Sequence, residues 1–397
     1  MKKILAPVLA VLMLFNLSGC YDVEEISYTV AAIAVGIDKG ENSKYRVSFH
    51  IEKAGSNEGE EEDSEGNKEN KKGGLITVEA PTVSSAYEMV NDLSSVHVSI
   101  DNLKMVLLSA QISKDGIYPV ISEFMCDMNL KNNAYVAVTD EDADTVMENI
   151  VPEDEEYLSA FYQRILYNRY KAETKYFLIE EVYFNMLSFP GQDIMLPLAR
   201  LKKANVPQSR LRSGILPESE NYEVEFSGGA AFSGGSLSGF FSDDDMMAAS
   251  LLYGDFKTEK ISFEYPEGSG EYIIVQLAQQ KKPEKRTKIK EGRIYDDAVI
   301  CLSATYLFAD EGKSFGEFTP GFEKYLKNEI KTLCEEFIKR SVYIYGADTL
   351  SIGKRLKKCF LTNGEFAAFY KKEKVLSAEI NVDVRLDIKS GGRFVFK

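Results

Sequence analysis

The stretch LSAEINVDVRLDI at residues 376–388 has the clearest structural pattern in the chain. Every even position from Leu376 to Ile388 is apolar, and every odd position between them is polar. Alternation with a period of two is typical of a β-strand that has one face buried and the other in water. We therefore predict a long half-buried strand whose sheet carries helices on its apolar face.

The residues before this strand predict a second strand of the same sheet and the helices that pack on it. Residues 297–308 predict a second long strand, and Thr319 is expected to cap a helix with Pro320 in its first turn. The inward stripe of that helix contains Leu326, Ile330, Leu333 and Phe337. A second helix is expected near 353–359, and together these elements predict a C-terminal α+β domain at residues 291–397.

A small β-rich middle domain is predicted at residues 206–290. It would contain a hairpin of residues 222–232 and 236–241 around Ser233-Gly234-Gly235, and a strand pair of residues 259–264 and 271–280. The glycine pairs match neither common phosphate-binding loop pattern.

The region 190–217 separates this unit from the N-terminal one and contains four prolines. It also holds a basic cluster of Arg200, Lys202, Lys203, Arg210 and Arg212. We interpret the cluster as a solvated linker rather than a docking face for an acidic partner.

Residues 20–205 predict an N-terminal mixed α/β domain. A hairpin of residues 26–37 and 45–51 opens it, and further strands then alternate with helices. Residues 153–188 are expected to form two helices. The segment 55–74 has no apolar residue and is interpreted as a disordered acidic loop rather than a cation site. The expected fold class is α+β: three mixed α/β domains, mostly with antiparallel or mixed sheets and helices packed on one face.

The N-terminus predicts an export signal. Lys2 and Lys3 precede an apolar run at residues 4–15, which is too short to span a bilayer. Leu17-Ser18-Gly19-Cys20 matches a bacterial lipobox, so we expect residues 1–19 to be a lipoprotein signal peptide and Cys20 to carry the lipid. An ordinary secretory signal with a chance cysteine is the alternative.

The charge of the chain excludes some partners. The net charge is −15, and loss of the signal with its two lysines would bring it to about −17. Such a balance disfavours binding to nucleic acid and to anionic lipid headgroups, whose phosphates attract basic proteins.

No catalytic, cofactor or metal site is predicted, and we do not expect an enzyme. The chain has two histidines, His50 and His97, and no GxSxG or HExxH motif. The aspartates Asp142, Asp144 and Asp243 to Asp245 are interpreted as helix-start residues. We expect free, mostly buried thiols rather than a Cys334–Cys359 disulfide, and the remaining cysteines are Cys126, Cys301, Cys334 and Cys359.

Several stretches together resemble the Ger(x)C family, the lipoprotein C subunits of spore nutrient germinant receptors. The matching stretches are Gly19–Ile26, Val35–Lys39, Leu103–Leu108, Lys114–Ile117, Gly229–Phe232 with Leu237–Phe240, and Tyr345–Asp348. Asn102 stands where the family often has a histidine, and the acidic segment 55–74 is unusual for it.

The resemblance implies a body that works by protein contact in nutrient-triggered spore germination. It would assemble with the integral membrane A and B subunits at the outer face of the inner spore membrane, and only Cys20 carries over as a functional residue. The alternatives are a solute-binding lipoprotein of a membrane transporter, which would have two similar lobes around a cleft, and a lipid-anchored hydrolase, for which no nucleophile and base are visible.

Overall fold

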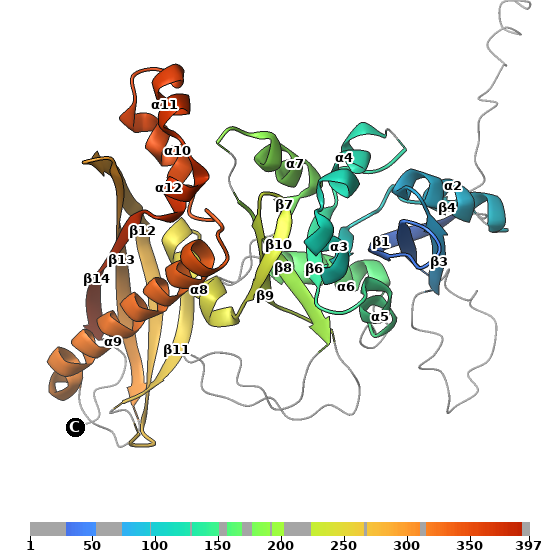
Figure 1. The fold of residues 1–397 in the computed structure, drawn as a ribbon. Coiled ribbons are helices and arrows are strands. Elements are labelled where there is room, and N and C mark those ends of the chain that lie inside the picture. The colour runs from blue at the N-terminus through green and yellow to red at the C-terminus, as the bar shows by residue number, and fades with distance from the viewer. Residues whose placement is uncertain are drawn as a thin grey trace, which may run out of the picture.

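The structure is a computed structural model in which two β-sheets carry the helices (Figure 1). It describes residues 29–52, 74–95, 97–127, 129–150, 157–168, 177–190, 193–201, 224–265, 268–309 and 315–390. The predicted signal peptide, Cys20 and the acidic segment except Gly74 lie outside these residues.

The first sheet is mixed. Among the described residues it has ten strands in the order β10-β9-β8-β6-β5-β1-β2-β3, with β4 beside β1 and β7 beside β6. The strands are β1 (Thr29–Lys39), β2 (Tyr45–Ile51), β3 (Gly74–Ala80), β4 (His97–Ser99), β5 (Met105–Ser109), β6 (Tyr135–Thr139), β7 (Phe177–Leu178), β8 (Met195–Leu201), β9 (Val224–Ser233) and β10 (Ser236–Phe241). Strands β1, β5, β6 and β8 run parallel, and parallel neighbours need long crossover connections, which here contain the helices.

Helices cover both faces of this sheet. One face carries α2 (Val83–Leu93), α3 (Ala110–Asp115), α4 (Tyr118–Cys126) and α7 (Ile179–Leu187). The other carries α5 (Ala143–Glu148) and α6 (Leu158–Asn168). The expectation of helices on one face therefore does not hold for the first sheet. For the same reason Ser48 and His50, on the polar side of β2, are buried.

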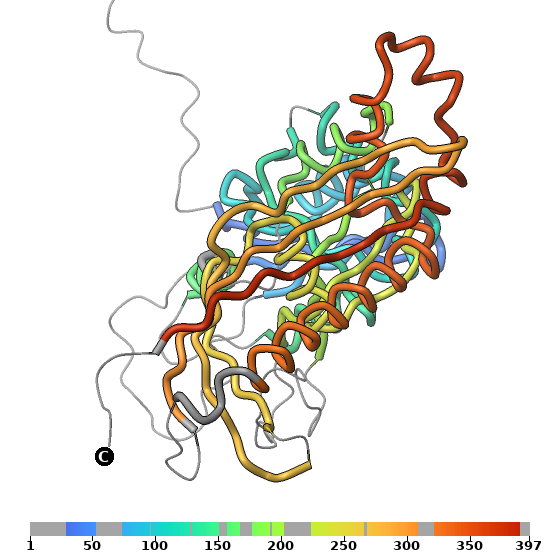
Figure 2. Tube along the Cα trace, turned by 90° about the vertical axis from the view of Figure 1, so that its left-hand side faces the viewer, coloured from blue at the N-terminus to red at the C-terminus, as the bar shows by residue number. Residues whose placement is uncertain are grey.

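The second sheet contains β11 (Thr258–Glu264), β12 (Tyr272–Lys290), β13 (Arg293–Ala309) and β14 (Glu379–Ser390) in that order. Its inner face packs on α8 (Asp243–Tyr253) and α9 (Phe315–Ile338). Figure 2 looks onto the outer face, where the long strands run side by side. The alternation quoted above is confirmed from Glu379 onward, since Val382 and Val384 are buried while Asp383 and Arg385 are exposed. The expected first residue, Leu376, instead ends α12. The α+β class with mixed sheets is also confirmed, because β14 pairs parallel to β13 and β12 antiparallel.

The chain between α9 and β14 forms a small helical lobe. A π-helical turn at Lys339–Ile344 follows α9 directly. The lobe contains α10 (Ile352–Leu356), a 3₁₀ turn at Lys357–Cys359, α11 (Asn363–Phe369) and α12 (Lys372–Leu376).

Three sequence expectations need correction. The predicted middle unit, 206–290, is not a sheet of its own, because β9 and β10 complete the first sheet while β11 and β12 belong to the second. Helix α9 begins at Phe315, before the expected cap at Thr319. The region 153–188, expected to be two helices, has the short strand β7 directly before α7.

Candidate functional site at the junction of the two sheets

The two histidines occupy ordinary strand positions. His50 on β2 is buried, and its Nδ1 lies 3.2 Å from the Tyr162 hydroxyl. Burial lowers the pKa of His50 to about 4, so its imidazole is neutral at physiological pH. His97 is exposed on β4. His50 is therefore part of the packed first sheet, and His97 lies on its surface.

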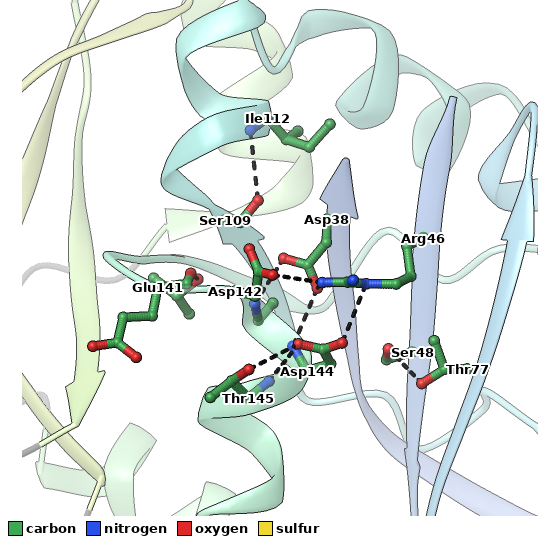
Figure 3. A network of polar contacts seen from close by, with 12 residues as sticks. Asp38, Arg46, Ser48, Thr77, Ser109, Ile112, Glu141, Asp142, Asp144 and Thr145 are labelled. Carbon is green, nitrogen blue, oxygen red and sulfur yellow. Dashed lines mark hydrogen bonds and ion pairs between the residues drawn. The ribbon is translucent and has the colours of Figure 1, made fainter. Parts of the chain in front are cut away.

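A polar network closes the carboxyl end of β1 (Figure 3). The buried Asp38 carboxylate accepts N–H bonds from Ala143 at 2.7 Å and from Asp144 at 3.2 Å, at the start of α5. Arg46 on β2 forms ion pairs of 2.6 Å with Asp142 and 3.2 Å with Asp144. Such a strand end beside a helix N-terminus is a common anion site. Here the chain's own Asp38 carboxylate occupies it, so the network braces β1, β2 and α5.

The carboxylates of this network are not independent. Burial raises the pKa of Asp38 to about 6, although the two N–H bonds favour its charged form and oppose the rise.

The helix-start interpretation of Asp142 and Asp144 is confirmed, because α5 begins at Ala143. Asp243 to Asp245 likewise form the first turn of α8. Within the described ranges, no group of three or more His, Cys, Asp and Glu residues is arranged to hold a metal ion.

A second network, the junction network, joins the two sheets through Asp193, Ser233, Gly234, Asp348 and Lys372. Asp193 lies just before β8, and its Oδ1 accepts the Gly234 N–H at 2.9 Å. Its Oδ2 accepts the Asp348 N–H at 2.8 Å and lies 2.9 Å from Lys372 Nζ. Lys372 also donates to Ser233 Oγ at 2.8 Å. The Asp193 side chain is only 10% exposed, whereas the Lys372 side chain is 34% exposed.

Asp348 organises the second half of the junction network. Its two carboxylate oxygens accept the N–H groups of Ile352 and Gly353, each at 2.8 Å, and so fix the start of α10. Burial raises the pKa of Asp348 to about 6, against the effect of these two bonds. Ser233 Oγ donates to the Gly346 carbonyl at 2.7 Å, so the stretch 346–348 is bonded to both β9 and the Asp193 loop.

A close backbone approach completes the junction. The Tyr345 hydroxyl donates to the Phe240 carbonyl at 2.8 Å, and the Tyr345 ring lies against Phe241 with centroids 5.4 Å apart. A Cβ on Gly239 would come within 2.2 Å of the Tyr345 ring. Only glycine fits at position 239 without movement of that ring.

A small pocket of about 190 Å³ opens beside the junction network. It is lined by Tyr118, Asn185, Met186, Asp193, Ile194, Gly234 and Gly235. The Asp193 carboxylate that lines it is already bonded to Gly234, Asp348 and Lys372. Asp193 and Lys372 therefore make intramolecular contacts that connect separate segments of the chain.

The four cysteines of the described ranges are free thiols. Cys301 and Cys334 are buried, whereas Cys126 and Cys359 are exposed. The expectation of free thiols holds for all four of these residues, and the expectation of burial holds for two. A Cys334–Cys359 disulfide is not formed.

The structure brings together residues that the sequence presents separately. The hairpin stretch at 237–240 contacts Tyr345, and Ser233, directly after the stretch 229–232, bonds to Gly346. Sequence reasoning did not single out Asp193 and Lys372, because neither belongs to a periodic pattern or a motif. Of the basic cluster, Arg200 lies on β8 and pairs with Glu225 at 2.7 Å, while the other four residues lie outside the described ranges.

The predicted lipidation site, Cys20, lies outside the described residues, as does the predicted signal peptide. In the described part of the chain, no helix is both long and apolar enough to cross a membrane.

Comparison with known proteins gives the family. Residues 22–201 match the spore germination protein N-terminal domain, and residues 227–392 match the spore germination B3/GerAC-like C-terminal domain. The crystal structure of the GerBC protein superposes with a TM-score of 0.53 and 14% identity, covering 92% of this chain and 99% of that chain, which shows a similar fold. A search of curated proteins finds no match. Because the two domain matches together span most of the sequence, the chain belongs to the Ger(x)C family of spore germination proteins.

Proposed function

We propose that this chain is a membrane-anchored lipoprotein subunit of a spore germinant receptor, and that it acts by protein contact rather than by catalysis. Its partners would be the integral membrane A and B subunits, at the outer face of the inner spore membrane, in nutrient-triggered germination. Membership of the family supports the role in germination. The lipobox at residues 17–20 supports the anchor.

The junction network is the observation that favours a contact role. Two of the stretches that resemble the family, 237–240 and 345–348, are bonded to each other through Phe240 and Tyr345, and Ser233 beside them bonds to Gly346. These bonds fix the position of the β9–β10 hairpin relative to the stretch 345–348. A rigid body of this kind presents fixed surfaces to a partner without a large loss of conformational entropy on binding.

Anchoring explains how such contacts could be sustained. Two or more acyl chains give stable membrane attachment, whereas one gives only marginal binding. Confinement at a bilayer replaces a dilute encounter with a high local concentration beside the receptor. The lipid on Cys20 would therefore contribute to assembly without touching a partner.

The solute-binding alternative expects two similar lobes around a cleft. The two sheets are unlike, because the first is large with helices on both faces and the second is narrow with helices on one. The pocket of about 190 Å³ beside the junction network is smaller than the common range of about 300–1,000 Å³ for ligand sites. A second pocket, of about 510 Å³, lies at α2 and α4 of the first sheet rather than in a cleft between two lobes; it is lined by Ser84, Glu123, Cys126, Asp127 and Asn129. We therefore do not propose a transport function.

Replacement of Cys20 tests the proposal. Mass spectrometry of protein extracted from spore membranes should find Cys20 as the first residue, carrying a diacylglyceryl group. Cys20→Ala should lose this modification, co-purify less with the A and B subunits, and slow nutrient-triggered germination. Cys126→Ala, at an exposed free thiol, is the matched control and should behave as wild type. Normal assembly and germination of Cys20→Ala would show that the anchor is not required.

A further inference from the structure

One end of this acidic protein is basic. The hairpin segment 281–293 contains seven cations and two carboxylates, and the lobe segment 352–376 contains the same numbers. The cations are Lys281, Lys282, Lys285, Arg286, Lys288, Lys290, Arg293, Lys354, Arg355, Lys357, Lys358, Lys371, Lys372 and Lys374. Each segment thus carries a net charge of +5 in a chain whose total is −15.

The two segments meet in space. The Cys359 thiol lies 3.4 Å from the Thr287 carbonyl, which places the 3₁₀ turn 357–359 against β12. Arg355 pairs with the buried Asp296 of β13 and fixes α10 to the same hairpin. Figures 1 and 2 both show the lobe beside the Lys290–Arg293 end of that hairpin. Two basic segments far apart in sequence therefore form one surface.

An exposed leucine projects from this surface. Leu361 is 97% exposed. Its backbone N–H donates to Glu365 Oε2 at 3.2 Å, and the neighbouring Phe360 packs against the rings of Phe366 and Phe369. The loop is held by these contacts, so the leucine points outward from a fixed base. We call Lys288, Lys290, Lys357, Lys358 and Leu361 the lysine-rich tip; its four lysines are all exposed.

The composition of this tip distinguishes between partners. Protein interfaces are depleted in lysine and enriched in arginine and aromatic residues, which bury large areas. Clustered lysines instead attract anionic lipid headgroups over several ångströms, without defined geometry, and a single apolar side chain can enter the headgroup layer. We propose that the lysine-rich tip docks on an anionic phospholipid surface, with Leu361 inserted among the headgroups.

This docking rests on the proposed function in one respect, because it requires a membrane close to the protein. Strand β1 begins nine residues after Cys20, a separation that a chain can span over about 30 Å at most. In Figure 1, β1 lies at the other end of the molecule from the tip. Acyl chains at one end and the tip at the other would hold the body along the membrane, since two weak attachments reinforce each other.

The absence of tryptophan from the sequence gives a direct test. In the full chain, Leu361→Trp creates a single tryptophan at the tip, whose emission can be excited apart from that of the tyrosines. On vesicles of phosphatidylcholine with phosphatidylglycerol, its emission should move to shorter wavelength and be quenched by bromine-labelled lipid. On phosphatidylcholine alone it should keep the emission of a solvated indole. Phe308→Trp, at an exposed residue near the opposite end of β13, is the matched reporter and should not respond.

Charge variants complete the experiment. In the Leu361→Trp background, Lys357→Gln with Lys358→Gln should weaken docking about 30-fold, since each lysine near an anionic surface contributes about fivefold. Lys324→Gln with Lys331→Gln, exposed on α9, should leave docking unchanged. A reporter that stays solvated on anionic vesicles, or responds equally on neutral ones, overturns the proposal while leaving the Cys20 test unaffected. A response only in spore membranes that contain the A and B subunits would also overturn it, in favour of a protein partner.

Discussion

The Lys372 ammonium lies 2.9 Å from the Asp193 carboxylate, although 179 residues separate them in the chain. The pair joins the chain just before β8 of the first sheet to the helical lobe that precedes β14 of the second. The same carboxylate accepts backbone N–H groups from Gly234 and Asp348, so one side chain connects three separate segments.

Asp193→Ala should destabilise the folded protein by about 3 kcal/mol, because it leaves Lys372 without its partner and two N–H groups without their acceptor. Urea unfolding measures this as a lower midpoint. Asp115→Ala is the matched control, because its pair with Lys39 is exposed and such pairs contribute less than about 1 kcal/mol. Equal effects of the two replacements would contradict the importance assigned to the junction network.

Gly239→Ala should cost about 1–3 kcal/mol, since the new Cβ would overlap the Tyr345 ring. The control is Gly364→Ala, where a Cβ meets nothing within 4 Å and the residue lies in α11. That change should be neutral or stabilise by up to about 1 kcal/mol. A second variant, Gly239→Ala with Tyr345→Ala, should lose less stability than the sum of the two single changes. Strict additivity would show that the ring is not the obstacle.

Stability should fall as the pH rises from about 4 to 6. Asp38 and Asp348 keep a proton in the folded protein up to a pKa of about 6, whereas their unfolded-state pKa is near 3.9. Their contribution is complete below the unfolded pKa and is lost as the pH passes the folded pKa, by up to about 3 kcal/mol each. Asp38→Asn and Asp348→Asn should each flatten the curve of unfolding free energy against pH. Unchanged curves would mean that these carboxyls do not govern this window.

Thiol labelling should separate the cysteines into two pairs. Cys126 and Cys359 are exposed and should react with a maleimide in the native protein. Cys301 and Cys334 are buried, and burial raises the pKa of the Cys334 thiol to about 12, so both should react only after unfolding. Peptide mapping after a short exposure measures this. Native-state modification of Cys334 at the rate of Cys359 would contradict the packing of α9.

Local patterns predicted many elements because their cause is local. Apolar alternation at 45–51 and 376–388 places side chains on opposite faces of a strand whatever surrounds it. Both strands are present, although the second begins at Glu379. Asp245, in the first turn of α8, accepts the backbone N–H of Ser242 three residues earlier, so its helix-start role was also visible. The burial of His50 was not, because it depends on α6, which is more than a hundred residues away.

The hairpin β9–β10 shows where local patterns become insufficient. Its two strands and turn were predicted, but a hairpin can pair with any free sheet edge. In the folded chain β9 pairs with β8, and its residues divide between two cores: Ala230 and Phe232 pack in the first, and Ala231 in the second. The boundary expected at 205/206 was therefore not a boundary between sheets.

By itself the sequence determined the lipobox at residues 17–20, the periodic strands and helices, and a resemblance to one family, because each of these depends on residues close together in the chain. Only the tertiary structure decided that Asp193 meets Lys372, that Gly239 lies under Tyr345, and that two basic segments form one tip. Those outcomes depend on which distant surfaces pack, and that is set by the summed free energy of burying them rather than by any short stretch.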